Sequence, residues 1–153
     1  MKFKIAYSSN IINNNLLYLE DEHSFYMNYG NAKIDLELLI NNIALQVSNN
    51  RIIALSGFCG LKDKMSSVLT VPTSSKGILS VNHNLKYGFA YSINENDEYK
   101  YPVSADLEKG WVCIGNSEKK GNAVEFIDNC IAVISDEDDF ISLWLKPMRL
   151  PKL

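Results

Sequence analysis

The chain has 153 residues, of which 46% are hydrophobic, and its 15 basic and 18 acidic side chains give a formal net charge of −3. This length is typical of one globular domain and is enough to form a core without disulfides or metal ions, so we expect a single domain over residues 1–153. The ordinary hydrophobic and charged shares argue against disordered, collagen-like and membrane classes. The slightly acidic balance argues against binding driven by phosphate contacts, because such binding requires a basic face.

The sequence shows neither a membrane-spanning run nor a secretory signal. Its longest apolar runs, such as 52–55 and 131–134, are far shorter than the roughly 20 residues that cross a bilayer. After Lys2 and Lys4 the N-terminus continues into serines and asparagines, whereas a signal peptide would continue into an apolar segment. We therefore expect a cytoplasmic protein.

Period-two alternation of apolar side chains predicts strands from the N-terminus onward. The pattern covers residues 2–7, and two shorter strands are expected at 16–20 and 25–29. Residues 66–71 continue the pattern up to a proline that cannot donate to a sheet ladder, and a further strand is expected at 77–81.

The clearest hairpin signal lies in the first third of the chain. Apolar alternation over 32–39 and 43–47 predicts two strands, and Asn49 and Asn50 separate the second of them from the next apolar run. Asparagine tolerates the left-handed backbone conformation, so this pair predicts a tight hairpin turn. A helix over 35–44 is the alternative, because apolar residues there also fit a 3.6-residue period.

The last third predicts a strand followed by a meander. The expected strands are 110–115, 123–127, 130–134 and 140–145. Trp111 and Trp144 lie in the first and last of these strands, and we expect both inside the core. With turn signals recurring every 8 to 12 residues or so, the fold class is mainly β. We expect antiparallel hairpins and meanders that form a β-sandwich or a curved barrel-like sheet, with little helix.

Aromatic residues occupy alternate positions in one further predicted strand. Tyr87, Phe89 and Tyr91 share a face there, and an aromatic stripe at strand spacing most often packs into a core. Packing is therefore our expectation. The alternative is a platform that stacks single-stranded nucleic acid, with Lys86 and Lys100 close by in sequence to contact phosphates.

Residue types that catalyse reactions or bind metals are sparse. His23 and His83 have no second histidine or cysteine at ligand spacing, and the Gly-x-Ser-x-Gly elbow is absent. The sequence has three cysteines, an odd number, and Cys59, Cys113 and Cys130 each lie in an apolar stretch, which predicts buried free thiols. We expect a protein that is not an enzyme and uses no metal or cofactor. Acid–base chemistry by the two histidines is the alternative.

Acidic side chains are concentrated in turns. Twelve of the 18 carboxylates lie in four turn-like segments, at 20–22, 95–98, 106–108 and 136–139. Solubility is one explanation, and the other is an acidic surface that attracts a basic partner and anchors it with tyrosines. The segment beside the tyrosines is the stronger candidate. The predicted partner-binding residues are Glu95, Asp97, Glu98, Tyr99, Tyr101, Asp136, Glu137, Asp138 and Asp139.

Two stretches of strand pattern resemble small single-domain bacterial proteins. The first combines 42–47 with 51–59, and the second combines 110–115 with 123–126, 131–133 and 141–147. In these stretches the chain is similar to immunity proteins of contact-dependent growth inhibition and related polymorphic toxin systems. The resemblance implies a small, cytoplasmic, non-enzymatic protein that blocks a nuclease toxin by covering its active site. It carries over no functional residue.

The sequence therefore predicts an immunity protein that binds a basic toxin domain, expected to cleave RNA, through an acidic surface. The alternative is a small β-rich enzyme, or a protein that binds single-stranded nucleic acid, whose site is assembled from residues far apart in the sequence.

Overall fold

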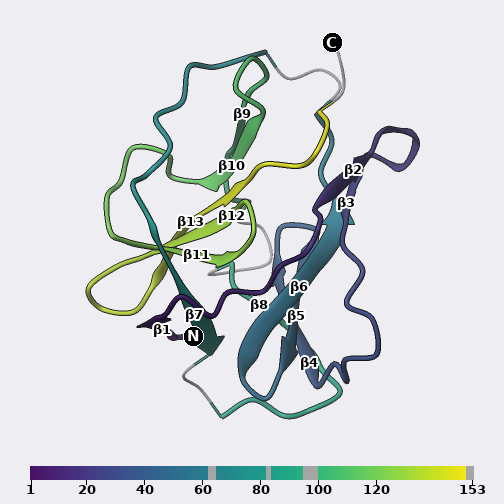
Figure 1. The fold of residues 1–153 in the computed structure, drawn as a ribbon, viewed down its shortest axis with the longest axis vertical. Helices are drawn as coiled ribbons and strands as arrows, with labels where there is room; N and C mark the ends of the chain where they lie inside the picture. Colours follow the sequence, from purple (N-terminus) through teal and green to yellow (C-terminus); the bar gives the residue numbers. More distant parts are fainter. Residues whose placement is uncertain (62–64, 82–83, 95–99, 151–153) are drawn as a thin grey trace.

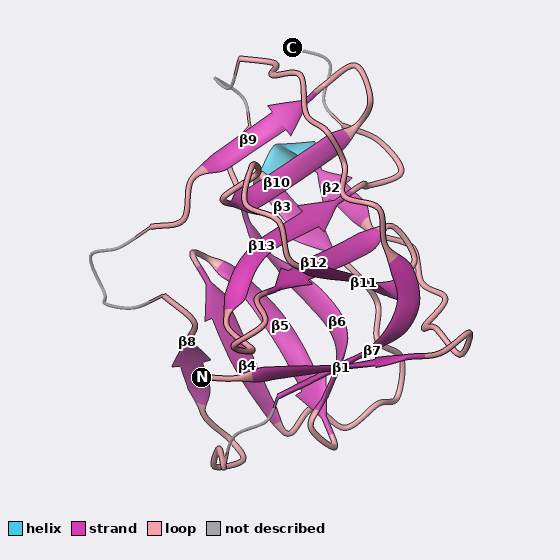
Figure 2. Cartoon of the chain, turned by 90° about the vertical axis from the view of Figure 1, so that its left-hand side faces the viewer, coloured by secondary structure: helices cyan, strands magenta, loops and turns pink. Residues whose placement is uncertain are grey.

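A computed structural model of the chain describes residues 1–61, 65–81, 84–94 and 100–150. Within these residues it contains thirteen strands and one 3-10 turn, η1 (Glu20–Glu22), so the prediction of a mainly β fold is confirmed (Figure 2). The strands are β1 (Phe3–Tyr7), β2 (Leu17–Leu19), β3 (Ser24–Tyr26), β4 (Leu36–Ile40), β5 (Ile43–Ser48), β6 (Arg51–Phe58), β7 (Ser75–Val81), β8 (Ala90–Ser92), β9 (Val103–Asp106), β10 (Trp111–Gly115), β11 (Asn122–Ile127), β12 (Cys130–Ile134) and β13 (Phe140–Leu145). In the described part of the chain, no helix has the length and apolar character needed to span a membrane.

The strands form one strongly bent sheet with open ends. Their pairing order is β8-β4-β5-β6-β7-β11-β12-β13-β10-β9, with β1 added to β7 and the β2–β3 hairpin added to β6 (Figure 1). Most neighbours are antiparallel, as predicted, and the β4–β8 and β7–β11 pairs are parallel. Because β7 pairs with β1 and β6 as well as with β11, it joins two layers.

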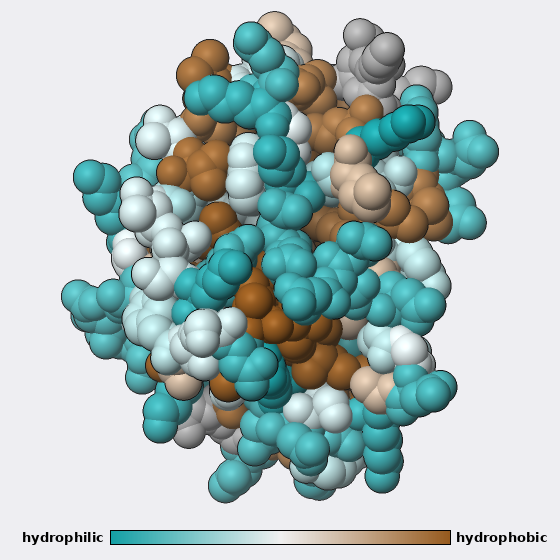
Figure 3. Space-filling model, in the orientation of Figure 1, coloured by the Kyte–Doolittle hydropathy of each residue, from teal (hydrophilic) through white to brown (hydrophobic). Residues whose placement is uncertain are grey.

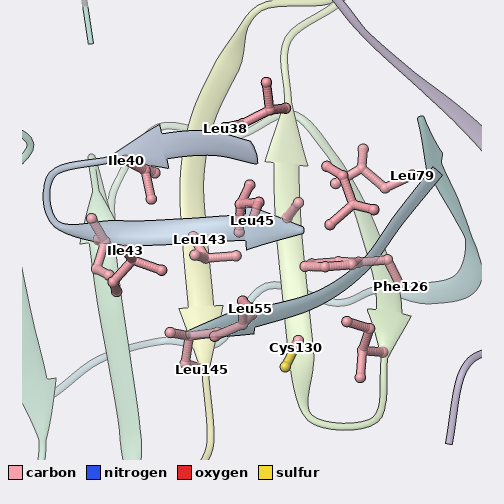
Figure 4. Packing of buried hydrophobic residues seen from close by; sticks show 14 of the residues in the cluster. Leu38, Ile40, Ile43, Leu45, Leu55, Leu79, Phe126, Cys130, Leu143 and Leu145 are labelled. Atoms are coloured by element: carbon pink, nitrogen blue, oxygen red, sulfur yellow. The ribbon is translucent and has the colours of Figure 1, made fainter. Parts of the chain in front are cut away.

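The core lies between the two layers. Figure 4 shows β4, β5 and β6 crossing steeply over β12 and β13, as in orthogonal sheet packing, with apolar side chains filling the space between them. The fully buried side chains in this space include Leu38, Ile40, Ile43, Leu45, Leu55, Phe126, Leu143 and Leu145. Burying each one stabilises the fold by roughly 1.5–3 kcal/mol. On the face seen in Figure 3, hydrophilic side chains cover most of the surface and apolar surface gathers over β5 and β6.

The predicted hairpin at Asn49 and Asn50 is confirmed. Both residues are left-handed, with φ of 50° and 64°, which matches the twist of the flanking strands β5 and β6. The buried Asp35 carboxylate supports the turn, because its Oδ2 accepts a hydrogen bond from the Asn49 backbone N–H at 2.8 Å. The alternative helix over 35–44 is wrong, since these residues form β4 and the start of β5.

The predicted meander is also confirmed as β11, β12 and β13. Trp144 in β13 is 1% exposed, as expected, and Cys113 of β10 pairs with it across the sheet. Trp111 is only half-buried, at the edge of the cluster around Trp144, with the Lys146 ammonium 5.9 Å from its ring centroid. The expectation that both tryptophans are core residues therefore holds fully only for Trp144.

The predicted strand at 66–71 is wrong. These residues belong to an extended segment, 66–74, which we call the strap. Among the described residues, its only strand-like pairing is an isolated bridge between Ser66 and Ala105. The strap crosses the outer face of β11–β13 (Figure 1) and packs Leu69 and Val71 against that face. The apolar alternation therefore reflects packing of side chains on a sheet and not strand pairing.

Candidate functional site

The strongest candidate site is the acidic turn between β12 and β13, residues 136–139. All four side chains are exposed. The Asp138 N–H donates to the Ser135 carbonyl at 3.0 Å, the Ser135 N–H donates to the Asp139 carbonyl at 2.8 Å, and the Asp139 N–H donates to Ser135 Oγ at 3.0 Å. Asp138 has φ of 67°, a left-handed conformation that aspartate tolerates better than most residues. These bonds close the turn and define the backbone from which the four carboxylates project.

The start of β1 and the residue before it, Lys2, are hydrogen-bonded to the acidic turn. The Phe3 N–H donates to the Asp138 carbonyl at 2.9 Å, and Lys2 Nζ donates to the Glu137 carbonyl at 3.1 Å and to Asp139 Oδ1 at 2.8 Å. The hydrogen bond between the Lys2 and Asp139 side chains raises the pKa of Lys2 and lowers the pKa of Asp139. The N-terminal strand thus anchors a turn more than 130 residues away in sequence.

Most of the turn's negative charge is unpaired. Lys2 and Asp139 form the only ion pair within the part of the chain that the structure describes. Asp136 Oδ1 accepts a hydrogen bond from the neutral Asn122 side chain at 3.0 Å. Asp136, Glu137 and Asp138 therefore present carboxylates that no described cation neutralises by direct contact.

A groove of about 490 Å³ opens beside the acidic turn. It is lined by Lys4, Ile5, Tyr7, Asn122, Ile134, Ser135 and Asp138. Tyr7 is 55% exposed, and its hydroxyl donates to the Ala123 carbonyl at 3.3 Å. It is therefore an exposed aromatic ring next to the charged turn, which sequence reasoning did not select as a site residue. Its only signal in the sequence is an aromatic residue at the end of an alternating strand, and β1 is far from the turn in sequence.

The other predicted binding residues fall into two groups. Glu95, Asp97, Glu98 and Tyr99 lie outside the described residues. Tyr101 is half-buried, and its backbone N–H and carbonyl both bond the Asn41 side chain, at 2.9 and 3.0 Å.

The Tyr101 ring belongs to an aromatic cluster that lies next to the acidic turn. Its centroid lies 5.3 Å from that of Phe140, which in turn lies 6.3 Å from that of Phe3. Phe140 follows directly after the acidic turn, so the structure brings Tyr101 and the turn together. The Tyr101 ring therefore packs against the residue that directly follows the turn.

The remaining acidic segments differ from one another. Glu20, Asp21 and Glu22 are exposed on η1, as expected of a solvated turn. Asp106 is buried, and its carboxylate accepts hydrogen bonds from the Leu69 N–H at 3.1 Å and the Lys109 N–H at 3.0 Å. These backbone donors hold the pKa of Asp106 below its usual range. Asp106 therefore fastens the strap and does not belong to an exposed acidic surface.

The aromatic stripe is not packed as predicted. Tyr87 is 58% exposed and Phe89 is 57% exposed, while Tyr91 is half-buried against the core with its ring centroid 6.3 Å from that of Phe89. The reason is that β8 is an edge strand with one neighbour, β4, so only part of the stripe has a layer to pack against. Lys86 is exposed beside it, and its N–H donates to the Tyr91 hydroxyl at 3.0 Å.

The cysteines and histidines show no constellation for chemistry among the described residues. Cys59, Cys113 and Cys130 are buried and form no disulfide, as predicted, and burial raises the pKa of Cys113 to about 12. No group of three or more histidine, cysteine or acidic side chains that could hold a metal ion occurs in the described ranges. His23 stacks edge-on against Phe58 at 6.3 Å, and His83 lies outside the described residues.

No family model matches the chain, and neither a curated protein nor a solved structure matches it.

Proposed function

We propose that this chain is an immunity protein of the cytoplasm that binds a basic, RNA-cleaving toxin domain and covers its active site. The observation that carries the proposal is the acidic turn, which is closed by backbone hydrogen bonds at Ser135, Asp138 and Asp139. In this turn Asp136, Glu137 and Asp138 are exposed and form no ion pair with a described residue. A nuclease must attract a polyanion, so the surface around its active site is basic. A fixed acidic surface would steer toward that region and compete with the substrate.

The groove beside the turn supports the same proposal. Interfaces combine aromatic anchors with a charged rim, and Tyr7 lies in the groove that Asp138 also lines. Because the hydroxyl of Tyr7 is bonded to the Ala123 carbonyl, its ring loses little conformational freedom when a partner binds. The function proposed is binding, with no catalytic role for these residues.

The direct test is capture of the product of the gene immediately upstream, since an immunity gene follows its toxin gene. The full chain should co-purify with that protein and protect cells that express it. The variant Asp136→Lys/Glu137→Lys should lose both properties, whereas Asp138 is left unchanged because of its left-handed backbone.

The matched control is Asp21→Lys/Glu22→Lys, which makes the same change in net charge on η1. In Figure 1 this turn lies on the opposite side of the molecule from the β12–β13 connection. Undiminished protection by the variant of the acidic turn would show that this turn is not the interface.

A second candidate function has one observation in its favour, the exposure of Tyr87 and Phe89 next to Lys86. Exposed aromatic rings with a neighbouring cation are the elements that stack and hold single-stranded nucleic acid. Fluorescence anisotropy with a labelled oligothymidylate tests this candidate. Binding that is lost in Tyr87→Ala/Phe89→Ala would support it, and absence of binding at low salt would exclude it.

A further inference from the structure

The outer face of the β10–β13 layer carries a second apolar cluster. Its buried members are Leu69, Cys113, Ala123, Ile131, Val133, Ile141 and Trp144. Unlike the inner face, this one has no second layer of strands over it in the described structure; the strap covers part of it (Figure 1). The loop 117–121 lies beside Val133 and Trp144 on the same face, and all the named members of the cluster are buried.

The strap is hydrogen-bonded at its beginning only. The Ser67 N–H donates to the Ala105 carbonyl at 2.7 Å, the Leu69 N–H donates to Asp106 Oδ2 at 3.1 Å, and Lys109 Nζ approaches the Leu69 carbonyl at 3.5 Å. From 70 to 74 the backbone makes no hydrogen bond to any described residue. This extended stretch keeps main-chain donors and acceptors that can still pair.

A cleft of about 680 Å³ runs along the unpaired stretch, and we call it the strap cleft. One wall is residues 68–73, the other is the loop 117–121, and Val133 and Trp144 lie at the bottom. The volume is within the range of specific ligand sites. The loop contributes Glu118, Lys119 and Lys120 to the cleft, so its net charge there is positive by one. All three side chains are exposed, and neither lysine forms an ion pair with a described residue.

We propose that the strap cleft binds an extended acidic peptide segment of a partner protein. The peptide backbone pairs with the strap at 70–73, where Pro72 offers only its carbonyl. The peptide's aliphatic side chains contact Val68 and Val71, and its carboxylates face Lys119 and Lys120. Main-chain pairing of this kind supplies affinity, while the alternating side chains supply specificity. The cleft has the opposite charge preference to the acidic turn, so the two surfaces bind different segments.

The test titrates the full chain, labelled with nitrogen-15, with capped peptides and follows backbone amide shifts by NMR. The first probe is Glu-Val-Glu-Val-Glu-Val, which should shift the amides of Thr70, Val71, Thr73 and Lys120. The basic probe Lys-Val-Lys-Val-Lys-Val should not bind there because of the two lysines. The acidic probe N-methylated at every residue should not bind either, because it has lost its N–H donors, and a single capped glutamate controls for simple anion binding.

Variants of the protein separate the contribution of Lys119 and Lys120 to peptide binding from the effect of the protein's overall net charge. Lys119→Glu/Lys120→Glu should weaken the acidic probe about tenfold or more, since two favourable charge contacts become repulsive. The control Lys33→Glu/Lys86→Glu makes the same change in net charge near β4 and β8 and should leave the dissociation constant unaltered. Both pairs of lysines are exposed, so folding should not change.

Several results would overturn the proposal. Equal binding of the methylated probe would show that the strap backbone is not used, and equal shifts with the capped glutamate would reduce the site to anion binding. Shifts at 70–73 that depend on protein concentration without peptide would assign the cleft to a second copy of the chain. An unchanged dissociation constant in the Lys119→Glu/Lys120→Glu variant would show that the cleft does not select an acidic peptide.

Discussion

The acidic turn and the strap are both surface connections, yet the fold holds them in opposite ways. The turn is bonded within itself, to Phe3 of β1 through Asp138, and to Lys2 through Glu137 and Asp139. The strap is bonded at Ser67 and Leu69 and makes no backbone hydrogen bond from 70 to 74 to any described residue. A connection closed by its own hydrogen bonds holds the backbone that carries its charges, whereas an extended stretch between two bonded segments keeps backbone groups that can pair with a partner. The two regions are therefore suited to different kinds of recognition.

The largest expected effect separates the residues beneath these two regions. Trp144→Ala, beneath the strap, should reduce the free energy of unfolding by about 3–5 kcal/mol, because a fully buried aromatic leaves a cavity. Phe140→Ala, beneath the acidic turn, should cost less because Phe140 is half-buried. Urea denaturation of both variants measures the difference. A larger loss for Phe140→Ala would mean that the turn, and not the strap, covers the more important apolar contact.

The next effect concerns the fastening of the strap. Asp106→Ala removes the acceptor of the Leu69 and Lys109 N–H groups, so both amides should exchange with solvent much faster. The Phe3 amide, which bonds the acidic turn, should keep its protection. Hydrogen exchange followed by NMR compares the three amides in one experiment. Equally faster exchange at all three amides would show that the strap and the acidic turn open together and are not held independently.

A pH dependence should accompany this fastening. The Asp106 pKa is lowered in the folded chain, so its contribution to stability is fully present above the ordinary aspartate value of about 3.9 and is lost as pH falls through the lower folded value. The stability difference between the parent and Asp106→Asn should therefore be constant from neutral pH down to about pH 4 and shrink below it. Urea midpoints across that range test the sign. A difference that grows on acidification would contradict the assignment.

The smallest effect is expected at the ion pair of the acidic turn. Lys2 and Asp139 are both solvent-exposed, so Lys2→Met should change the urea midpoint very little. The hydrogen bond from the Phe3 N–H to the Asp138 carbonyl does not depend on the Lys2 side chain and should persist. Retained exchange protection at Phe3 checks this. Loss of that protection would show that the ion pair, and not the backbone, holds the turn to β1.

Local chemistry made much of the fold predictable from the sequence. The Asn49-Asn50 turn and the β11–β12–β13 meander depend on residues adjacent in the chain, and turn residues with period-two alternation were enough to place them. The strap shows where this reasoning ends. Leu69 and Val71 alternate as strand residues do, but whether such a segment pairs or lies across a sheet is decided by elements distant in sequence.

The candidate site divides in the same way. The exposure of Asp136 to Asp139 follows from a tight acidic turn between two apolar strands, and it was predictable. The support from Lys2 and Phe3, the position of Tyr7 and the burial of Asp106 all arise from contacts between distant segments. Composition therefore identified acidic turns as a group but could not separate the exposed turn from the buried fastening.

The central claim is that the acidic turn steers a basic protein partner, and association kinetics test it most directly. The rate of association between the chain and the upstream gene product should be measured across ionic strength for the parent, Asp136→Lys/Glu137→Lys and Asp21→Lys/Glu22→Lys. We predict a rate that falls steeply with salt for the parent and for the η1 control, since salt screens steering. The rate for the variant of the acidic turn should be slow and nearly independent of salt. Equal rates and equal salt dependence for all three proteins would contradict the claim.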